Sequence, residues 1–105
     1  MANGKKISKK DAIDWVKKYK NKHTNSTNSI QYDASLIQDL LNIPGCVSVR
    51  IHFAENGNGT NCMVLVAVDS SGNAILPPSD TSTTDAAFIL DDGALCPPVC
   101  QGGDL

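Results

Sequence analysis

The chain has 105 residues and a formal net charge of −2, and 41% of its residues are hydrophobic although only 5% are aromatic. This length is enough for one domain and too short for two independent hydrophobic cores. Because aromatic residues are scarce, the core must be built from Val, Ile, Leu and Ala. The composition therefore predicts a single domain over residues 1–105 and excludes large multidomain enzymes.

The small net charge conceals two segments of opposite sign. Residues 1–23 contain eight Lys and two Asp, a formal charge of +6, whereas residues 24–105 contain Arg50 against nine acidic residues, a formal charge of −8. A nucleic acid or an anionic membrane would attract the first segment and repel the second. Both forces act over the same screening length of about 8 Å, so they oppose each other. We therefore expect neither a nucleic-acid nor a membrane partner.

The sequence predicts no membrane span and no export signal. Its longest apolar run, residues 63–68, is far shorter than the roughly 18 residues that a transmembrane helix needs. No apolar segment of about 7–15 residues follows the N-terminal lysines, as it would in a signal peptide. The expected location is the cytoplasm, where cysteines are more often free thiols or metal ligands than disulfides.

A first helix is expected over residues 9–22, after a flexible segment over residues 1–7. Ser8 and Asp11 have the spacing of a capping box, and the lysines gather in the last turns, where the helix dipole favours positive charge. Four apolar residues follow at helical spacing, namely Ala12, Trp15, Val16 and Tyr19. Residues 23–29 contain no apolar side chain and are expected to form a polar linker.

A second helix is expected over residues 34–42. Asp33 is its predicted N-cap, and Pro44 and Gly45 end it. Its apolar stripe consists of Leu36, Ile37, Leu40 and Leu41.

Residues 46–54 and 62–68 are expected to form a hairpin around a loop rich in Asn and Gly. The first strand alternates apolar and polar residues. A register that pairs Phe53 with Cys62 and Val47 with Val68 places every strongly β-prone residue on one face, and we prefer it for that reason. Residues 74–76 are expected to add a short third strand, and residues 88–90 either an edge strand or an anchor for the tail.

The predicted fold is α+β, with two N-terminal helices packed on one face of a three- to four-stranded antiparallel meander. In the preferred register the other face carries Met63, Leu65 and Ala67. This face is too apolar to be exposed to solvent, so a helix, the C-terminal segment or a second subunit is expected to cover it. Residues 101–105 are expected to be flexible.

The spacing of Cys96 and Cys100 suits two of the four ligands of a structural zinc site. Cys46 is the nearest third ligand, but the preferred register places His52 and Cys62, the remaining soft ligands, on opposite faces. A disulfide, a redox pair or two free thiols are alternatives for Cys96 and Cys100. The intervening prolines argue against a thioredoxin-like thiol, because they remove the helix and the N–H donors that lower its pKa.

Arg50 and His52 lie two residues apart on one strand face and are the candidate residues for binding an anion. The alternative is that both bond to backbone or acidic groups at the sheet edge. No catalytic residue is predicted, because no nucleophile stands beside a general base.

Residues from Pro44 onward combine three motifs: Pro44-Gly45-Cys46 with Arg50-Ile51 and Phe53-Ala54, then Leu65-Val66 with Val68-Asp69 and Gly72-Asn73, then Cys96-Pro97-Pro98 with Cys100. In this order they resemble a group of small uncharacterised bacterial proteins that have a sheet hairpin and a Cys-Pro-Pro-x-Cys ending. The resemblance covers about the last 60 residues, implies that the cysteine tail is part of the design, and carries no catalytic residue.

The function that we expect first is a non-enzymatic binding or assembly module without a cofactor, whose partner is another protein or a second copy of the chain. A homodimer through Met63, Leu65 and Ala67 is the most specific form of this hypothesis. The rival hypothesis is a thiol or zinc protein that uses Cys96 and Cys100. A third hypothesis is a small enzyme that acts on an anionic substrate through Arg50 and His52.

Overall fold

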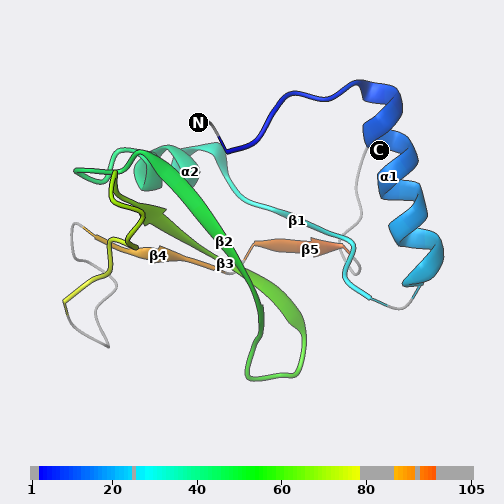
Figure 1. The fold of residues 1–105 in the computed structure, drawn as a ribbon. Helices are drawn as coiled ribbons and strands as arrows, with labels where there is room; N and C mark the ends of the chain where they lie inside the picture. Colours follow the sequence, from blue (N-terminus) through cyan, green and yellow to red (C-terminus); the bar gives the residue numbers. More distant parts are fainter. Residues whose placement is uncertain (1–2, 25, 79–86, 92, 97–105) are drawn as a thin grey trace.

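The computed structural model describes residues 3–24, 26–78, 87–91 and 93–96. These residues form two helices, an antiparallel sheet of three strands and a separate two-stranded sheet, which is an α+β arrangement (Figure 1). The elements in chain order are α1 (Lys9–Lys22), β1 (Ser29–Gln31), α2 (Ala34–Leu41), β2 (Ser48–Glu55), β3 (Asn61–Val68), β4 (Ile89–Leu90) and β5 (Ala94–Cys96).

The first helix, α1, has the predicted bounds but does not pack on the sheet. The Ser8 side chain caps it by accepting a hydrogen bond from the Asp11 backbone N–H at 3.0 Å. No residue of α1 is buried, and Trp15 is 55% exposed. The expectation that both helices cover one sheet face is therefore wrong for α1. The Ser8 cap and the lysines of the last turn stabilise this helix locally.

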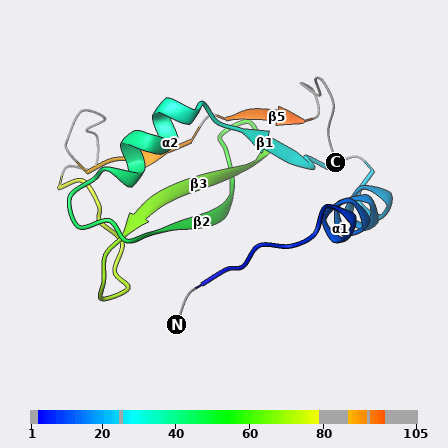
Figure 2. The same ribbon diagram turned by 90° about the horizontal axis from the view of Figure 1, so that it is seen from above.

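The second helix, α2, lies on one face of the three-stranded sheet and supplies the core (Figure 2). It ends one residue earlier than predicted, with Asn42 as its C-cap. Leu40 points from α2 into the sheet and is completely buried. The buried cluster around it consists of Leu40, Ile43, Leu65, Ala67 and Leu90.

The hairpin of β2 and β3 forms as predicted, but its register differs by one residue. Ala54 pairs with Cys62, and Phe53 pairs with Met63 rather than with Cys62. Because a shift of one residue turns every side chain to the other face, Leu65 and Ala67 lie in the core beneath α2. A helix is therefore the cover of this face among the three that were expected, and Leu65 and Ala67 are not available as the surface of a dimer.

The loop between β2 and β3 explains this register. Asn56 accepts a backbone hydrogen bond from Gly59 and donates one to Thr60, at 3.0 and 2.9 Å, so Asn56 and Thr60 face each other. Gly59 has a φ of +77°, as the third residue of such a three-residue loop requires. Counting back from this pair places Ala54 opposite Cys62.

The next loop, residues 69–73, repeats the same geometry. The Asp69 carboxylate accepts hydrogen bonds from the backbone N–H groups of Ser71 and Asn73, and Gly72 has a φ of +86°. The loop brings Ala74 beside Val68 in an isolated antiparallel bridge, which is what remains of the predicted third strand. The expected edge strand is β4, which pairs with β3.

The two-stranded sheet of β1 and β5 was not predicted from the sequence. Ser29 pairs with Cys96 and Gln31 with Ala94, so residues about 65 positions apart meet. Gly93, which precedes β5, packs closely against Ile30. A Cβ added at Gly93 would collide with the Ile30 side chain. A hydrogen bond of 2.5 Å from the Tyr32 hydroxyl to the Met63 carbonyl ties this segment to β3.

The loop geometry predicts different costs for two glycine substitutions. Gly59→Ala should lower the free energy of unfolding by about 1 kcal/mol, because a residue with a Cβ is strained at positive φ. Gly57→Ala is the matched control, since an added Cβ meets nothing at either position and Gly57 has no positive φ. Urea denaturation of both variants measures the difference, and equal stabilities would contradict the assigned loop conformation.

Within the described residues, no helix has both the length and the hydropathy that a membrane crossing requires.

Candidate binding surface

The outer edge of β2 is the most unusual surface of the described structure. In the three-stranded sheet the order is β2, β3, β4, so β2 has a strand partner on one side only within the described ranges. It is eight residues long, and the unpaired N–H and C=O groups of such an edge are a template for pairing with another strand. No proline and no lysine interrupts it.

Three large apolar side chains that share one face are exposed along this edge: Val47, which directly precedes β2, and Ile51 and Phe53 within it, which are 65%, 53% and 86% exposed. We call them the β2 row. Val49, between them, packs against the core beneath α2. The helix is too short to cover the rest of the sheet, so the β2 row remains open to solvent, and an exposed patch of this kind marks an interaction surface.

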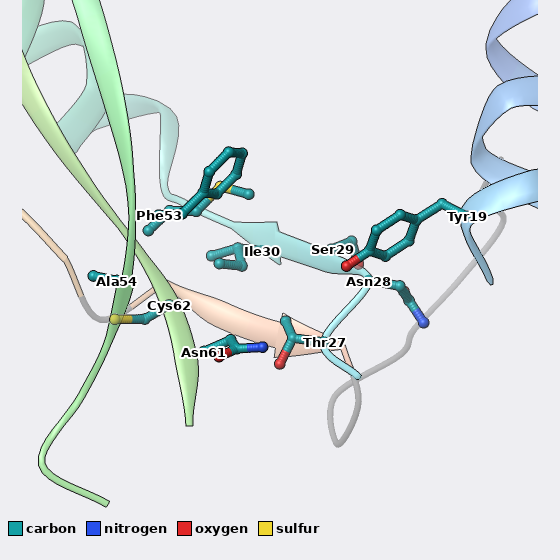
Figure 3. A pocket seen from close by; sticks show the side chains of 10 residues that line it. Tyr19, Thr27, Asn28, Ser29, Ile30, Phe53, Ala54, Asn61 and Cys62 are labelled. Carbon is teal, nitrogen blue, oxygen red and sulfur yellow. The ribbon is translucent and has the colours of Figure 1, made fainter. Parts of the chain in front are cut away.

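A groove of about 530 Å³ begins where the β2 row ends (Figure 3). Phe53 from β2 and Tyr19 from α1 stand on opposite sides of it, with Ile30 of β1 between them. The lining residues are Tyr19, Thr27, Asn28, Ser29, Ile30, Phe53, Ala54, Asn61, Cys62 and Met63. The end of the predicted polar linker therefore forms one wall of the groove.

One polar atom in this wall has no partner. The side-chain oxygen of Asn28 is buried and accepts no hydrogen bond from any described residue. A buried acceptor without a donor costs about 1–3 kcal/mol, so a donor that reaches this atom is favoured. The groove thus combines an apolar lining with at least one unused acceptor.

Cys62 forms the buried end of the groove and contacts Asp91. Burial raises the pKa of the Cys62 thiol above its ordinary value, and the charge of the Asp91 carboxylate and a hydrogen bond to it raise the pKa further. The thiol is therefore protonated at neutral pH and is a poor nucleophile. Cys62 is 8% exposed, which fits a small core residue better than a reactive one.

The Cys62 environment predicts a pH dependence. The unfolded chain loses this proton at a lower pH than the folded chain, so the stability that Cys62 contributes should fall as pH rises from the ordinary thiol pKa towards the raised one.

Asp91→Asn should lower the pKa of Cys62 and speed its alkylation at pH about 8 by less than about tenfold, because burial remains. Mass spectrometry of the Cys62 peptide follows the rate, and slower alkylation would contradict the assigned contact.

The structure places Arg50 and His52 on the same face of β2 but in different surroundings. The Arg50 guanidinium donates a hydrogen bond to the Gly72 carbonyl at 3.0 Å and lines a broad, largely polar depression beside the 69–73 loop. His52 is exposed on the same strand face and does not line that depression. Arg50 therefore braces a turn, and the anion-binding hypothesis for the two residues remains a prediction.

The four cysteines do not form one described cluster. Cys46 donates a weak hydrogen bond from its thiol to the Ser48 carbonyl at 3.3 Å. The actual register places His52 and Cys62 on the same face, which removes the objection raised from the sequence, yet no group of three metal-ligating residues occurs among the described side chains. Cys96 is placed through its backbone in β5, and Cys100 lies outside the described residues.

Comparison of the chain with models of protein families, with curated proteins and with solved structures finds no match in any of the three. The resemblance to small bacterial proteins with a Cys-Pro-Pro-x-Cys ending therefore stays a prediction. Function must be inferred from the surfaces of this chain.

Proposed function

We propose that this protein is a small non-enzymatic assembly module that forms a homodimer in the cytoplasm through antiparallel pairing of β2 with β2 of a second copy. The observation that carries this proposal is the β2 row, since Phe53 is 86% exposed on an edge strand. Pairing two edges satisfies the free backbone groups and removes the apolar side chains from water.

The side chains of β2 favour a two-fold axis at Ile51. This register places Ile51 opposite Ile51 of the second copy and Val49 opposite Phe53 of the second copy, and such apolar cross-strand pairs stabilise a sheet. An axis at Arg50 would place two guanidinium groups opposite each other, which is unfavourable. The resulting sheet would have six strands and one α2 helix from each copy.

The candidate chemical groups support a binding role better than catalysis. Burial and Asp91 hold the Cys62 thiol in its protonated form by raising its pKa, and the Arg50 guanidinium is engaged by the Gly72 carbonyl. A thiol or zinc role for Cys96 and Cys100 remains an alternative, but no contact among the described residues favours it.

Light scattering after size-exclusion chromatography, over a series of protein concentrations, tests the proposal. We expect the mass to rise from monomer to dimer with concentration and to do so in about 1 M NaCl as well, where charge interactions are screened within about 3 Å. A chain that stays monomeric at concentrations approaching about 1 mM would contradict the proposal, because its dissociation constant would then be too high for a functional dimer.

A further inference from the structure

The α1 helix presents an aromatic and basic face that the fold leaves open. Trp15, Lys18, Tyr19 and Lys22 follow at positions i, i+3, i+4 and i+7, so they lie on one side of the helix. Trp15 is 55% exposed, Tyr19 is 44% exposed, and both lysines are exposed. The Tyr19 ring stacks on His23 at 4.4 Å, which holds the end of this face in place. We call these four residues the α1 face.

The outer side of α2 carries a complementary row. Asp33, Leu36 and Asp39 follow at steps of three residues and all are exposed, with Leu36 42% exposed. This acidic and apolar row matches the basic and aromatic α1 face in both charge and hydrophobicity. It belongs to the segment 24–105, which carries a formal charge of −8, whereas residues 1–23 carry +6. The chain thus contains both halves of a complementary contact.

The two helices lie at opposite ends of the molecule (Figures 1 and 2). Helix α2 covers the Val49 end of the sheet, while α1 stands across the groove from Phe53. β1 lies between them in the chain, and its pairing with β5 holds Ser29–Gln31 extended over roughly 10 Å. In this arrangement the α1 face and the row on α2 of one chain stand apart, so each is available to a second copy.

We propose that α1 of each copy docks its face on the Asp33, Leu36 and Asp39 row of the other copy. This inference rests on the proposed dimer: antiparallel pairing of β2 sets the Phe53 end of one copy beside the Val49 end of the second, and so brings each α1 towards the other α2. Specific interfaces bury about 1,200–2,000 Å² in total, and one strand edge with the β2 row supplies only part of that area. Docking of the two α1 helices supplies the remainder.

An anionic membrane is the other surface that a basic helix with an exposed Trp could bind. The charge distribution favours the second copy, since the acidic segment 24–105 would be repelled by anionic lipid and is attracted to α1. Exposure of the chain to vesicles of phosphatidylserine distinguishes the two. Docking predicts that the vesicles leave the dimer intact, whereas transfer of α1 to the vesicles would overturn the proposal.

Charge reversal on each side tests the contact. The variant Lys18→Glu/Lys22→Glu and the variant Asp39→Lys should each dimerise about tenfold more weakly than the wild type, and an equimolar mixture should recover affinity, because the acidic α1 of one variant meets the lysine on α2 of the other. The matched control, Lys10→Glu/Lys17→Glu, changes the net charge equally on the opposite side of α1. Equal weakening by the control, or no recovery on mixing, would overturn the proposal.

Trp15 is the only tryptophan of the chain, so its fluorescence reports directly on the α1 face. We expect its emission to shift to shorter wavelength as protein concentration rises and to return when about 1 M NaCl is added. An emission that does not change with concentration would contradict docking between copies. If β2 pairing occurs without α1 docking, the mass still doubles while Trp15 emission stays constant, and if β2 pairing fails, the mass does not rise.

Discussion

Phe53→Lys should keep the chain monomeric at concentrations at which the wild type is dimeric, with a dimerisation constant about 100-fold weaker or more. Burial of a Phe side chain is worth about 1.5–3 kcal/mol, and the symmetric contact uses Phe53 twice. The introduced lysine must also leave water to enter the paired sheet, and lysines on edge strands oppose pairing for this reason. Sedimentation equilibrium at several concentrations gives the two constants.

Leu76→Lys is the matched control for this experiment. It introduces the same charge in place of another exposed apolar side chain, which is 57% exposed and lies outside β2. Because Phe53 is 86% exposed, its replacement should leave the free energy of unfolding of the monomer within about 0.5 kcal/mol of the wild-type value. A Phe53→Lys variant that dimerises as well as Leu76→Lys would show that the β2 row is not the interface.

Leu40→Ala is expected to cause the largest loss of stability of any single truncation on α2. Leu40 is fully buried and is the centre of the contact between the helix and the sheet. Removing its side chain in such a site costs about 2–5 kcal/mol, because the lost transfer free energy adds to that of the cavity left behind. This loss is a large share of the total free energy of unfolding of a small domain, which is about 5–15 kcal/mol.

Leu41→Ala provides the comparison, since Leu41 is the next residue of α2 and is 50% exposed. It removes the same atoms from the same helix, and we expect the free energy of unfolding to fall by less than about 1 kcal/mol. Urea denaturation followed by circular dichroism measures both variants in one set of conditions. Equal losses would contradict the orientation of α2 on the sheet.

The local signals in the sequence predicted the local structure well. The Ser8 cap and the spacing of Trp15 and Tyr19 located α1, and alternation along β2 located the hairpin. These signals arise within one turn of helix or a few residues of strand, so they do not depend on the rest of the molecule. The packing of α1 could not be predicted in this way, because an apolar stripe shows that a helix can be covered and not what covers it.

The hairpin register shows where side-chain patterns fail. Placing every strongly β-prone residue on one face favoured the pairing of Phe53 with Cys62, but β3 is apolar on both faces and therefore accepts either register. The Asn56 to Thr60 loop contained the deciding information. A three-residue loop that ends in a glycine at positive φ, here Gly59, fixes which residues face each other.

Prediction of the candidate surface was less successful for a different reason. The face of β2 that carries Val49 and Ile51 does lie towards α2, but α1 was expected to cover its other end and does not, so Ile51 and Phe53 are exposed. Arg50 and His52 were predicted as binding residues because they are polar, although the proposed function rests on the exposed apolar residues beside them, Ile51 and Phe53. Pairing of β1 with β5 joins Ser29 to Cys96 across most of the chain, and no local pattern reports such a contact.

Hydrogen exchange of the β2 backbone amides at two protein concentrations is the most direct test of pairing between copies. In the dimer, the outward-facing N–H groups of β2 would be hydrogen-bonded to the second copy, so we expect their exchange to slow as concentration rises, while the amides of α2 and β3 exchange at unchanged rates. If β2 exchanges equally fast in a sample shown by mass to be monomeric and in one shown to be dimeric, pairing through this edge is contradicted.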